Sequence, residues 1–266
     1  MSGAYPQQPT SVPIREEFED LLESQWTRRV ACQNECDLNK SCSCQRKIVH
    51  VHALQAWWKK RVSESGITKL ERFLHESPVP IHLSLPVKPT RISKSGQSCF
   101  CTLSLLLKQG RDHLIDRFCE ANMYDDYLVR SENDQILRRQ LADVVQRGEV
   151  EVIIEDFHKE KWAYCPLNLT LDMAVNLQGT KVILPFCSKI KLSSKGGTAS
   201  VYWVAVQKDL VSDNALALAL QDSLYNDDEF GEVSRLTLCE RNKLTPSSVT
   251  RWCSNLTAAT ISETSS

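Results

Sequence analysis

The segment that decides the fold, residues 181–206, reads KVILPFCSKIKLSSKGGTASVYWVAV. Apolar and β-branched runs stand on both sides of a cluster of Ser, Lys and Gly, a pattern typical of two strands joined by a turn. Short runs of this kind predict strands near 181–185, 189–193, 200–207 and 215–220. Helical periodicity dominates the chain before this segment. The sequence therefore predicts an α+β fold, with a mostly helical N-terminal region followed by a small antiparallel sheet.

Composition and periodicity divide the rest of the chain. Residues 1–13 are rich in Pro, Gln and Ser, and residues 240–266 in Ser and Thr, so both ends are expected to be disordered. Between them we expect a helical segment (14–76), a proline-containing linker (77–98), a helical region (99–175) and the strand-rich region (181–236). Apolar spacing predicts helices at 14–30, 45–63, 67–75, 99–108, 112–121, 132–147 and 149–160.

The turn between the two strands contains part of a phosphate-binding pattern. In the pattern G-x-G-x-x-G-x-V, Val201 sets the register, and the three glycine positions then hold Ser194, Gly196 and Ala199. Gly197 lies out of register but adds flexibility. Glycine suits such a loop because backbone amides approach phosphate oxygens closely where no Cβ intervenes. Without further context, the same residues also fit an ordinary hairpin turn.

This segment resembles the first two strands and the glycine-rich loop in the amino-terminal lobe of serine/threonine protein kinases. The resemblance implies ATP with Mg²⁺ as a ligand. It places backbone amides of residues 194–200 at the phosphates, and Val201 and Ala217 against the adenine. A kinase-like lobe of this kind is expected over residues 181–236.

The parts that a kinase uses for catalysis do not follow. A strand with A-x-K is expected at residues 217–219, where Ala219 takes the place of the lysine that holds the phosphates. Glu232, in a helix expected at 226–233, stands where the partner glutamate of that lysine would be. No H-R-D-x-x-x-x-N or D-F-G follows. We therefore assign no catalytic residue and expect a degenerate kinase-like chain that stops before a second lobe.

The resemblance extends upstream, to kinase-domain proteins of filamentous fungi that carry a helical region before the kinase. It covers roughly residues 99–236. Asp125-Asp126-Tyr127-Leu128 matches one segment of these proteins, and a second segment is matched by Phe157, Lys161-Trp162 and Pro166. Lys161 departs from the usual glutamine and Val129 from the usual proline. The family implies a kinase-like lineage without implying activity.

Composition limits the classes of partner. The chain has 266 residues, 42% hydrophobic and 24% charged, with a formal net charge of −1, which fits a soluble globular protein. Its near-neutral charge gives no reason to expect nucleic acid or an anionic membrane as a partner. The first residues lack the pattern of a secretory signal, so we expect an intracellular protein, cytoplasmic or nuclear, that binds a protein partner.

A cluster of cysteines offers a rival interpretation. The spacing is Cys32-x3-Cys36-x5-Cys42-x-Cys44, followed by two histidines. Thiolates and imidazoles at short range are zinc ligands, but this spacing matches no familiar zinc finger. The alternative is a loop of free cysteines between two helices, since reduced thiols are the rule inside cells.

Two interpretations are also open for the run Trp57-Trp58-Lys59-Lys60-Arg61. Aromatic and cationic residues together suit a nucleic-acid or membrane surface. Helical spacing instead puts Trp57 or Trp58 on the same apolar stripe as Leu54, and this core interpretation is favoured. The two leading hypotheses are thus a pseudokinase-like protein that binds a partner or weakly holds nucleotide, and a helical interaction module unrelated to kinases.

Overall fold

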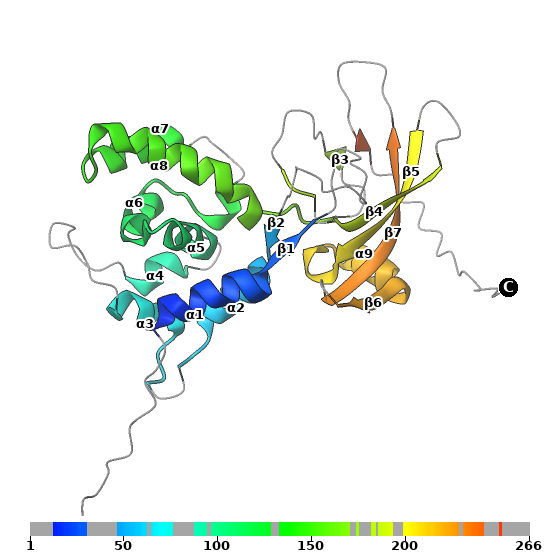
Figure 1. Cartoon of the computed structure of the whole chain (residues 1–266), viewed down its shortest axis with the longest axis horizontal. Helices are drawn as coiled ribbons and strands as arrows, with labels where there is room; N and C mark the ends of the chain where they lie inside the picture. Colours follow the sequence, from blue (N-terminus) through cyan, green and yellow to red (C-terminus); the bar gives the residue numbers. More distant parts are fainter. Residues whose placement is uncertain are drawn as a thin grey trace, which may run out of the picture. The chain divides into compact units, whose positions relative to one another are not determined.

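The structure is a computed structural model. It describes residues 13–30, 47–62, 65–76, 88–94, 97–128, 133–170, 174–175, 182–184, 186–193, 199–228, 231–241 and 250–251. The chain forms two compact units (Figure 1). We call Met1–Thr27 with His50–His158 the helical unit, and Arg28–Val49 with Lys159–Ser266 the sheet unit. The expected α+β fold is confirmed, but the unit boundary falls earlier than residue 175, and residues 28–49 join the sheet unit.

The helical unit is built from short helices. They are α1 (Ile14–Leu21), the π-helical turn Leu22–Trp26, α2 (Val51–Lys59), α3 (Lys69–Glu76), α4 (Pro89–Ile92), α5 (Phe100–Lys108), α6 (Ile115–Glu120), α7 (Asp134–Ala142) and α8 (Arg147–Glu160). The helix predicted at 14–30 ends early, because β1 (Thr27–Arg29) begins there. The start of the helix predicted at 45–63 is likewise a strand, β2 (Lys47–Val49), which pairs with β1. The linker predicted at 77–98 contains α4.

Aromatic rings form the core between α1, α2 and α3. The rings involved are Phe18, Trp26, Trp57, Trp58 and Phe73, with neighbouring centroids 4.7–6.1 Å apart. Trp58 is fully buried, and its indole N–H donates to Ser104 Oγ over 2.8 Å. Since a buried ring of this size contributes roughly 1.5–3 kcal/mol, this cluster is a large part of the unit's stability. The favoured core interpretation of the two adjacent tryptophans is confirmed.

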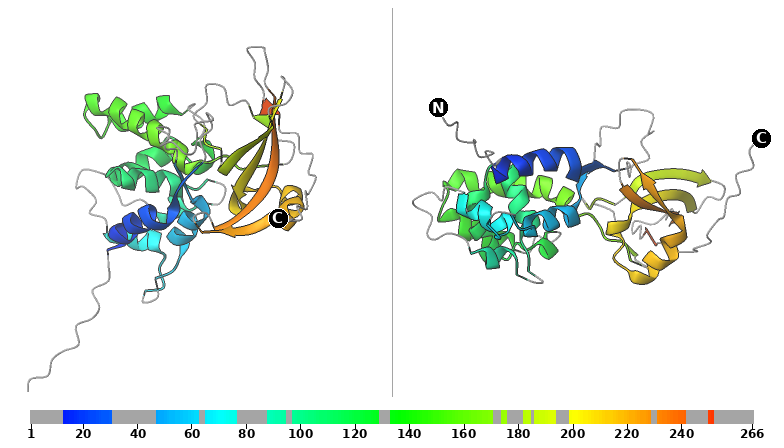
Figure 2. Two further views of the ribbon diagram at one scale, coloured as in Figure 1. Left: turned by 45° about the vertical axis from the view of Figure 1, so that its right-hand side comes forward. Right: turned by 90° about the horizontal axis from the view of Figure 1, so that it is seen from below.

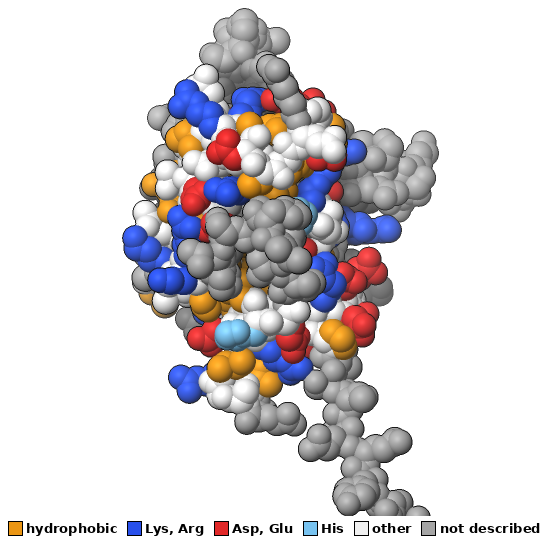
Figure 3. All heavy atoms as spheres, turned by 90° about the vertical axis from the view of Figure 1, so that its left-hand side faces the viewer, with side chains coloured by type: hydrophobic (Ala, Val, Ile, Leu, Met, Phe, Trp, Pro, Cys, Tyr) orange, Lys and Arg blue, Asp and Glu red, His pale blue; other side chains and the backbone are white. Residues whose placement is uncertain are grey.

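Acidic and basic side chains alternate over the surface of the helical unit, and several of them form ion pairs. Arg138 on α7 meets Glu151 on α8 through two hydrogen bonds, and His158 Nε2 lies 2.9 Å from both carboxylate oxygens of Asp134. Figure 3 shows acidic and basic side chains interspersed on the face turned toward the viewer, with smaller apolar areas between them. This mixed surface gives no field of one sign that would steer a highly charged partner.

The sheet unit contains a four-stranded antiparallel sheet of order β4-β5-β7-β6. Its strands are β4 (Phe186–Ser193), β5 (Ala199–Gln207), β6 (Leu224–Asp227) and β7 (Gly231–Arg241). The turned views in Figure 2 show these strands twisting together beside α9 (Asn214–Leu220). A second small sheet pairs β3 (Ala174–Val175) with β8 (Thr250–Arg251). The tail predicted to be disordered from residue 240 thus includes the end of β7 and all of β8.

One face of this sheet carries the core of the unit. Tyr202, Val204 and Val206 alternate along β5 and pack with Leu216 and Leu220 of α9. We call this the inner face and the opposite side of the same strands the outer face. Because successive side chains of a strand point to opposite sides, the residues between these three lie on the outer face.

Two predictions about the connection between β5 and β7 were wrong. The strand predicted at 215–220 is the helix α9, which begins after Asp213, whose carboxylate accepts hydrogen bonds from the amides of Ala215 and Leu216. Alternating Ala and Leu have strong helix propensity, and a capping aspartate fixes the start. The helix predicted at 226–233 is the β6–β7 hairpin. Gly231 adopts φ +72° at the start of β7, a conformation that glycine reaches without strain.

Candidate functional site

The structure confirms the two strands that flank the predicted glycine-rich loop, but residues 182–184 of the strand predicted at 181–185 are not in a strand. β4 and β5 are antiparallel neighbours in the sheet. Ser194, Gly196 and Gly197 lie outside the described residues. Ala199 begins β5, and Val201 follows on the same strand, paired with Cys239 of β7. The arrangement therefore supplies the strands that such a loop needs.

The remaining predicted nucleotide contacts are not brought together with Val201. Ala217 lies exposed on α9 instead of on a strand. Glu232 lies on β7, seven positions from Cys239, the partner of Val201. At about 3.4 Å per residue this separation exceeds 20 Å. Glu232 and Val201 therefore do not line one small site.

Glu232 forms an ion pair with Lys208, which follows β5 directly, and not with a residue at position 219. Its carboxylate lies 2.9 Å from Lys208 Nζ, and both side chains are about half exposed. An exposed pair of this type contributes at most about 1 kcal/mol. The pair holds the end of β5 beside the start of β7, and it resembles a surface contact rather than a phosphate-holding pair.

Strand β7 lies next to β5 and contains no lysine. Its central cation is Arg235, whose guanidinium carbon lies 4.5 Å from the centroid of the Tyr225 ring on β6. Arginine stacked in this way is held in place and presents its edges to solvent. Sequence reasoning missed this residue because the pairing of β6 with β7 was not anticipated.

Asp125, which belongs to the segment that resembles the fungal proteins, caps the start of α5. Its buried carboxylate accepts hydrogen bonds from the backbone amides of Phe100, Cys101 and Thr102, at 3.0–3.3 Å, and from the hydroxyl of Ser98. These amides begin α5 and have no partner within the helix. Burial raises the pKa of Asp125 to about 6, while the hydrogen bonds act in the opposite direction. The side chain thus fastens α5 to the segment that follows α6.

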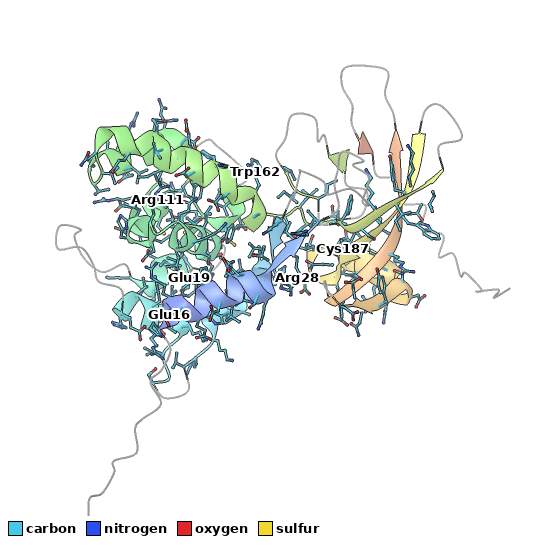
Figure 4. All side chains as sticks on the ribbon, viewed as in Figure 1. Glu16, Glu19, Arg28, Arg111, Trp162 and Cys187 are labelled. Carbon is cyan, nitrogen blue, oxygen red and sulfur yellow. The ribbon has the colours of Figure 1, made fainter. Side chains whose placement is uncertain are left out.

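Two other residues of the upstream resemblance, Phe157 and Lys161, are also packed into the structure, whereas Asp126 and Tyr127 are exposed. Phe157 is fully buried, with its ring 4.8 Å from that of Phe118. Lys161 is 2% exposed, and its ammonium lies 5.1 Å from the ring centroid of Trp162, which Figure 4 labels. These positions account for the residues as parts of the two cores.

Two cysteines form a close pair in the helical unit. Cys119 Sγ lies 3.3 Å from Cys99 Sγ, and both side chains are buried. The contact with Cys119, together with burial, raises the pKa of Cys99 well above its usual range. A thiol kept protonated in this way is a poor nucleophile and a poor metal ligand.

The four cysteines of the zinc hypothesis, Cys32, Cys36, Cys42 and Cys44, are not among the residues that the structure describes. Among the residues that are described, no three His, Cys, Asp or Glu side chains gather as a metal site would require. None of the helices in the described part of the chain has the length and apolarity to span a membrane.

The outer face of the sheet is unusual because apolar side chains are exposed on it. Ile190 is 53% exposed, Leu192 43% and Trp203 37%. Ile190 and Trp203 are directly paired across β4 and β5, whereas Leu192 lies at a second register shift, between Lys191 and Ser193. Paired side chains on one face of adjacent strands lie within contact distance. Ile190 and Trp203 therefore form one continuous surface, which we call the outer apolar surface.

A bulge in β4 produces this surface. Phe186 is buried opposite Val206, but the register shifts before Ser188, at Cys187, which Figure 4 labels. Without the shift, Ile190 and Leu192 would follow Phe186 onto the inner face. An extra residue reverses the alternation, so Ile190 points outward while Lys189 lies 4.1 Å from the inner Tyr202 ring. Sequence periodicity alone gives the opposite assignment.

Comparison with known proteins adds no relative: no family model, curated protein or solved structure matches this chain.

Proposed function

We propose that this chain is a non-catalytic binding protein that docks a protein partner on the outer face of its four-stranded sheet. One observation carries the proposal: Ile190 and Trp203, which are paired across two strands, expose a continuous apolar surface. Exposed apolar clusters of this kind are characteristic of interaction sites, because their contact with water is unfavourable. Tryptophan is also among the residues that contribute most to binding energy at interfaces.

The geometry of the predicted nucleotide contacts supports a role without phosphoryl transfer. Transfer requires a cation at the phosphates, positioned magnesium and a base that accepts the substrate's proton. Ala219 is exposed on α9, and Glu232 pairs with Lys208 at a distance from Val201. We therefore expect purified protein to transfer no labelled phosphate from ATP to itself or to a generic protein substrate.

A photo-crosslinking experiment tests the binding role. p-Benzoylphenylalanine replaces Ile190 on the outer face or, as a matched control, Leu218, which is 71% exposed on α9. In extracts of cells that produce the protein, we expect a defined cross-linked product from position 190 and none from position 218. Equal products from the two positions would contradict the proposal, because they would reflect general stickiness of exposed apolar residues.

Weak nucleotide binding is a second candidate, and the β4–β5 hairpin favours it. β4 and β5 are antiparallel neighbours, as the two strands beside a phosphate-covering loop would be, and residues 194–198 lie between them in the sequence. We propose that backbone amides there contact the phosphates of ATP. Millimolar ATP with Mg²⁺ should raise the melting temperature of the wild type but not of Gly196→Val. An absence of any shift in the wild type removes this candidate and leaves the docking role untouched.

A further inference from the structure

We propose that the outer apolar surface binds a short amphipathic helix of a partner protein, whose apolar stripe lies on Ile190 and Trp203 and whose acidic margin lies beside Arg235. This inference rests on the docking role proposed above and adds the chemistry of the partner. Three features of the sheet carry it: the distribution of charge, the fixed position of Arg235, and the size of the surface.

The charge around the surface is one-sided. Strands β4 and β5 contain no acidic residue, and Glu232 on β7 lies three positions from Arg235, so it alternates onto the inner face. On β7, Arg235 is exposed and pairs with Ala205, two positions from Trp203 on β5. A carboxylate does lie on β6, at Asp227, but it pairs with Gly231 at the opposite end of the hairpin. A partner that covers Trp203 and reaches β7 therefore meets a cation and gains from carrying carboxylates at that margin.

Arg235 is already held in the position that such a margin requires. Its guanidinium carbon lies 4.5 Å from the Tyr225 ring centroid. Stacking restricts the side chain and leaves the N–H edges of the guanidinium available to a carboxylate. Because the arginine loses little conformational entropy on binding, an acidic partner residue has a prearranged contact.

The size of the surface suits a helix better than a second copy of this chain. Ile190, Trp203 and Thr237 lie in one row across β4, β5 and β7. Strands about 4.8 Å apart make this row about 10 Å wide, close to the diameter of a helix. A stable dimer needs about 800 Å² and roughly 20–30 residues on each side. The described outer face offers far fewer residues, which fits one short segment.

A displayed peptide library provides the probe. The peptides are 18-residue helices with Leu, Ile, Phe or Met at heptad positions a and d, and with Glu, Lys or Gln varied at the flanking positions. Selection is carried out on the full chain, and affinities of the enriched peptides are measured by fluorescence anisotropy. We expect enrichment of Glu on one flank. Trp203→Ser should weaken binding at least tenfold, whereas the control Leu218→Ser should leave it unchanged.

A charge exchange at residue 235 tests the acidic margin directly. Arg235→Glu should change the enriched flank from Glu to Lys, and Arg235→Lys should retain Glu. If peptides need Trp203 but their flank does not respond to residue 235, the acidic-margin inference is overturned while the docking role stands. If Trp203→Ser leaves binding unchanged, the outer face is not the docking surface and both proposals fail.

Two further measurements distinguish other occupants. A proline placed in the middle of an enriched peptide should abolish binding, because a helix interior does not accommodate it. Retained affinity would mean that the peptide binds as an extended strand, which overturns the helix assignment. Sedimentation analysis should give a monomer over the concentrations used. A dimer that Trp203→Ser dissociates would identify a second copy as the occupant and also overturn the inference.

Discussion

At the scale of single residues, Asp125 shows how one side chain joins two parts of the chain. A carboxylate that accepts amide hydrogen bonds usually has a depressed pKa, whereas burial raises it. Burial is the larger effect here, and the pKa of Asp125 rises to about 6. The residue thus combines a required structural contact with a cost for carrying its charge.

Replacement of this carboxylate should destabilise the helical unit. Asp125→Ala leaves three buried amides of α5 without their acceptor, and we expect a loss of about 2 kcal/mol or more in unfolding free energy. Urea titration followed by tryptophan fluorescence measures it, since Trp57 and Trp58 lie in this unit. Asp125→Asn, which keeps one acceptor oxygen, should lose less. Equal stability of the alanine variant and the wild type would contradict the capping role.

The raised pKa of Asp125 should also make the stability of the helical unit depend on pH. The pKa of Asp125 in the folded chain, about 6, lies above the ordinary value of 3.8, so the folded state binds the proton more tightly than the unfolded state does. This group's contribution to stability should therefore increase as the pH falls through 6 toward 4. Urea titrations at pH 7 and pH 5 should show a larger advantage of wild type over Asp125→Asn at pH 5. The reverse order would mean that the pKa is depressed.

At the scale of elements, α9 shows why a short apolar run is ambiguous. Residues 214–220 read NALALAL, which alternates as a strand would and yet consists of strong helix formers. The capping bonds from Asp213, at 2.8 and 3.0 Å, favour the helix. Leu216 and Leu220 then lie four residues apart and reach the inner face together.

The cap of α9 can be tested by itself. Asp213→Ala should destabilise the sheet unit by about 1 kcal/mol, because two amides at the start of the helix lose their acceptor. Asp213→Ser retains a capping oxygen, so its loss of stability should be only a few tenths of the loss in Asp213→Ala. Hydrogen exchange of the α9 amides provides the readout, with faster exchange expected in the alanine variant alone. Unchanged protection in that variant would show that packing on the inner face suffices to form α9.

At the scale of the whole molecule, the exposed apolar surface affects solution behaviour. Ile190→Ser combined with Trp203→Ser should reduce the fluorescence of bound bis-ANS, a dye that reports exposed apolar surface. The unfolding free energy should stay within about 0.5 kcal/mol of wild type, because both side chains are substantially exposed. Leu218→Ser is the matched control. Strong loss of stability in the double variant would indicate that the two side chains contribute to the core.

Local sequence determined much of this protein. Helical periodicity located α3, α5, α7 and α8, and the apolar stripe of α2 predicted one of the two adjacent tryptophans in the core, where the structure buries both. The β-branched run before Gln207 and the turn residues before it located the β4–β5 hairpin. These features depend on spacing and propensity, which are properties of contiguous residues and can be read from the chain.

Tertiary structure decided what depends on register and on distant partners. Whether Ile190 points inward or outward is fixed by the bulge at Cys187, because a shift of one residue moves every following side chain to the other face. Residues 231–241 form a strand because they pair with β5, and this pairing carries Glu232 away from Val201 and brings Arg235 to Tyr225. Strand pairing joins segments far apart in sequence, so local pattern does not specify it. The candidate site belongs to this second class.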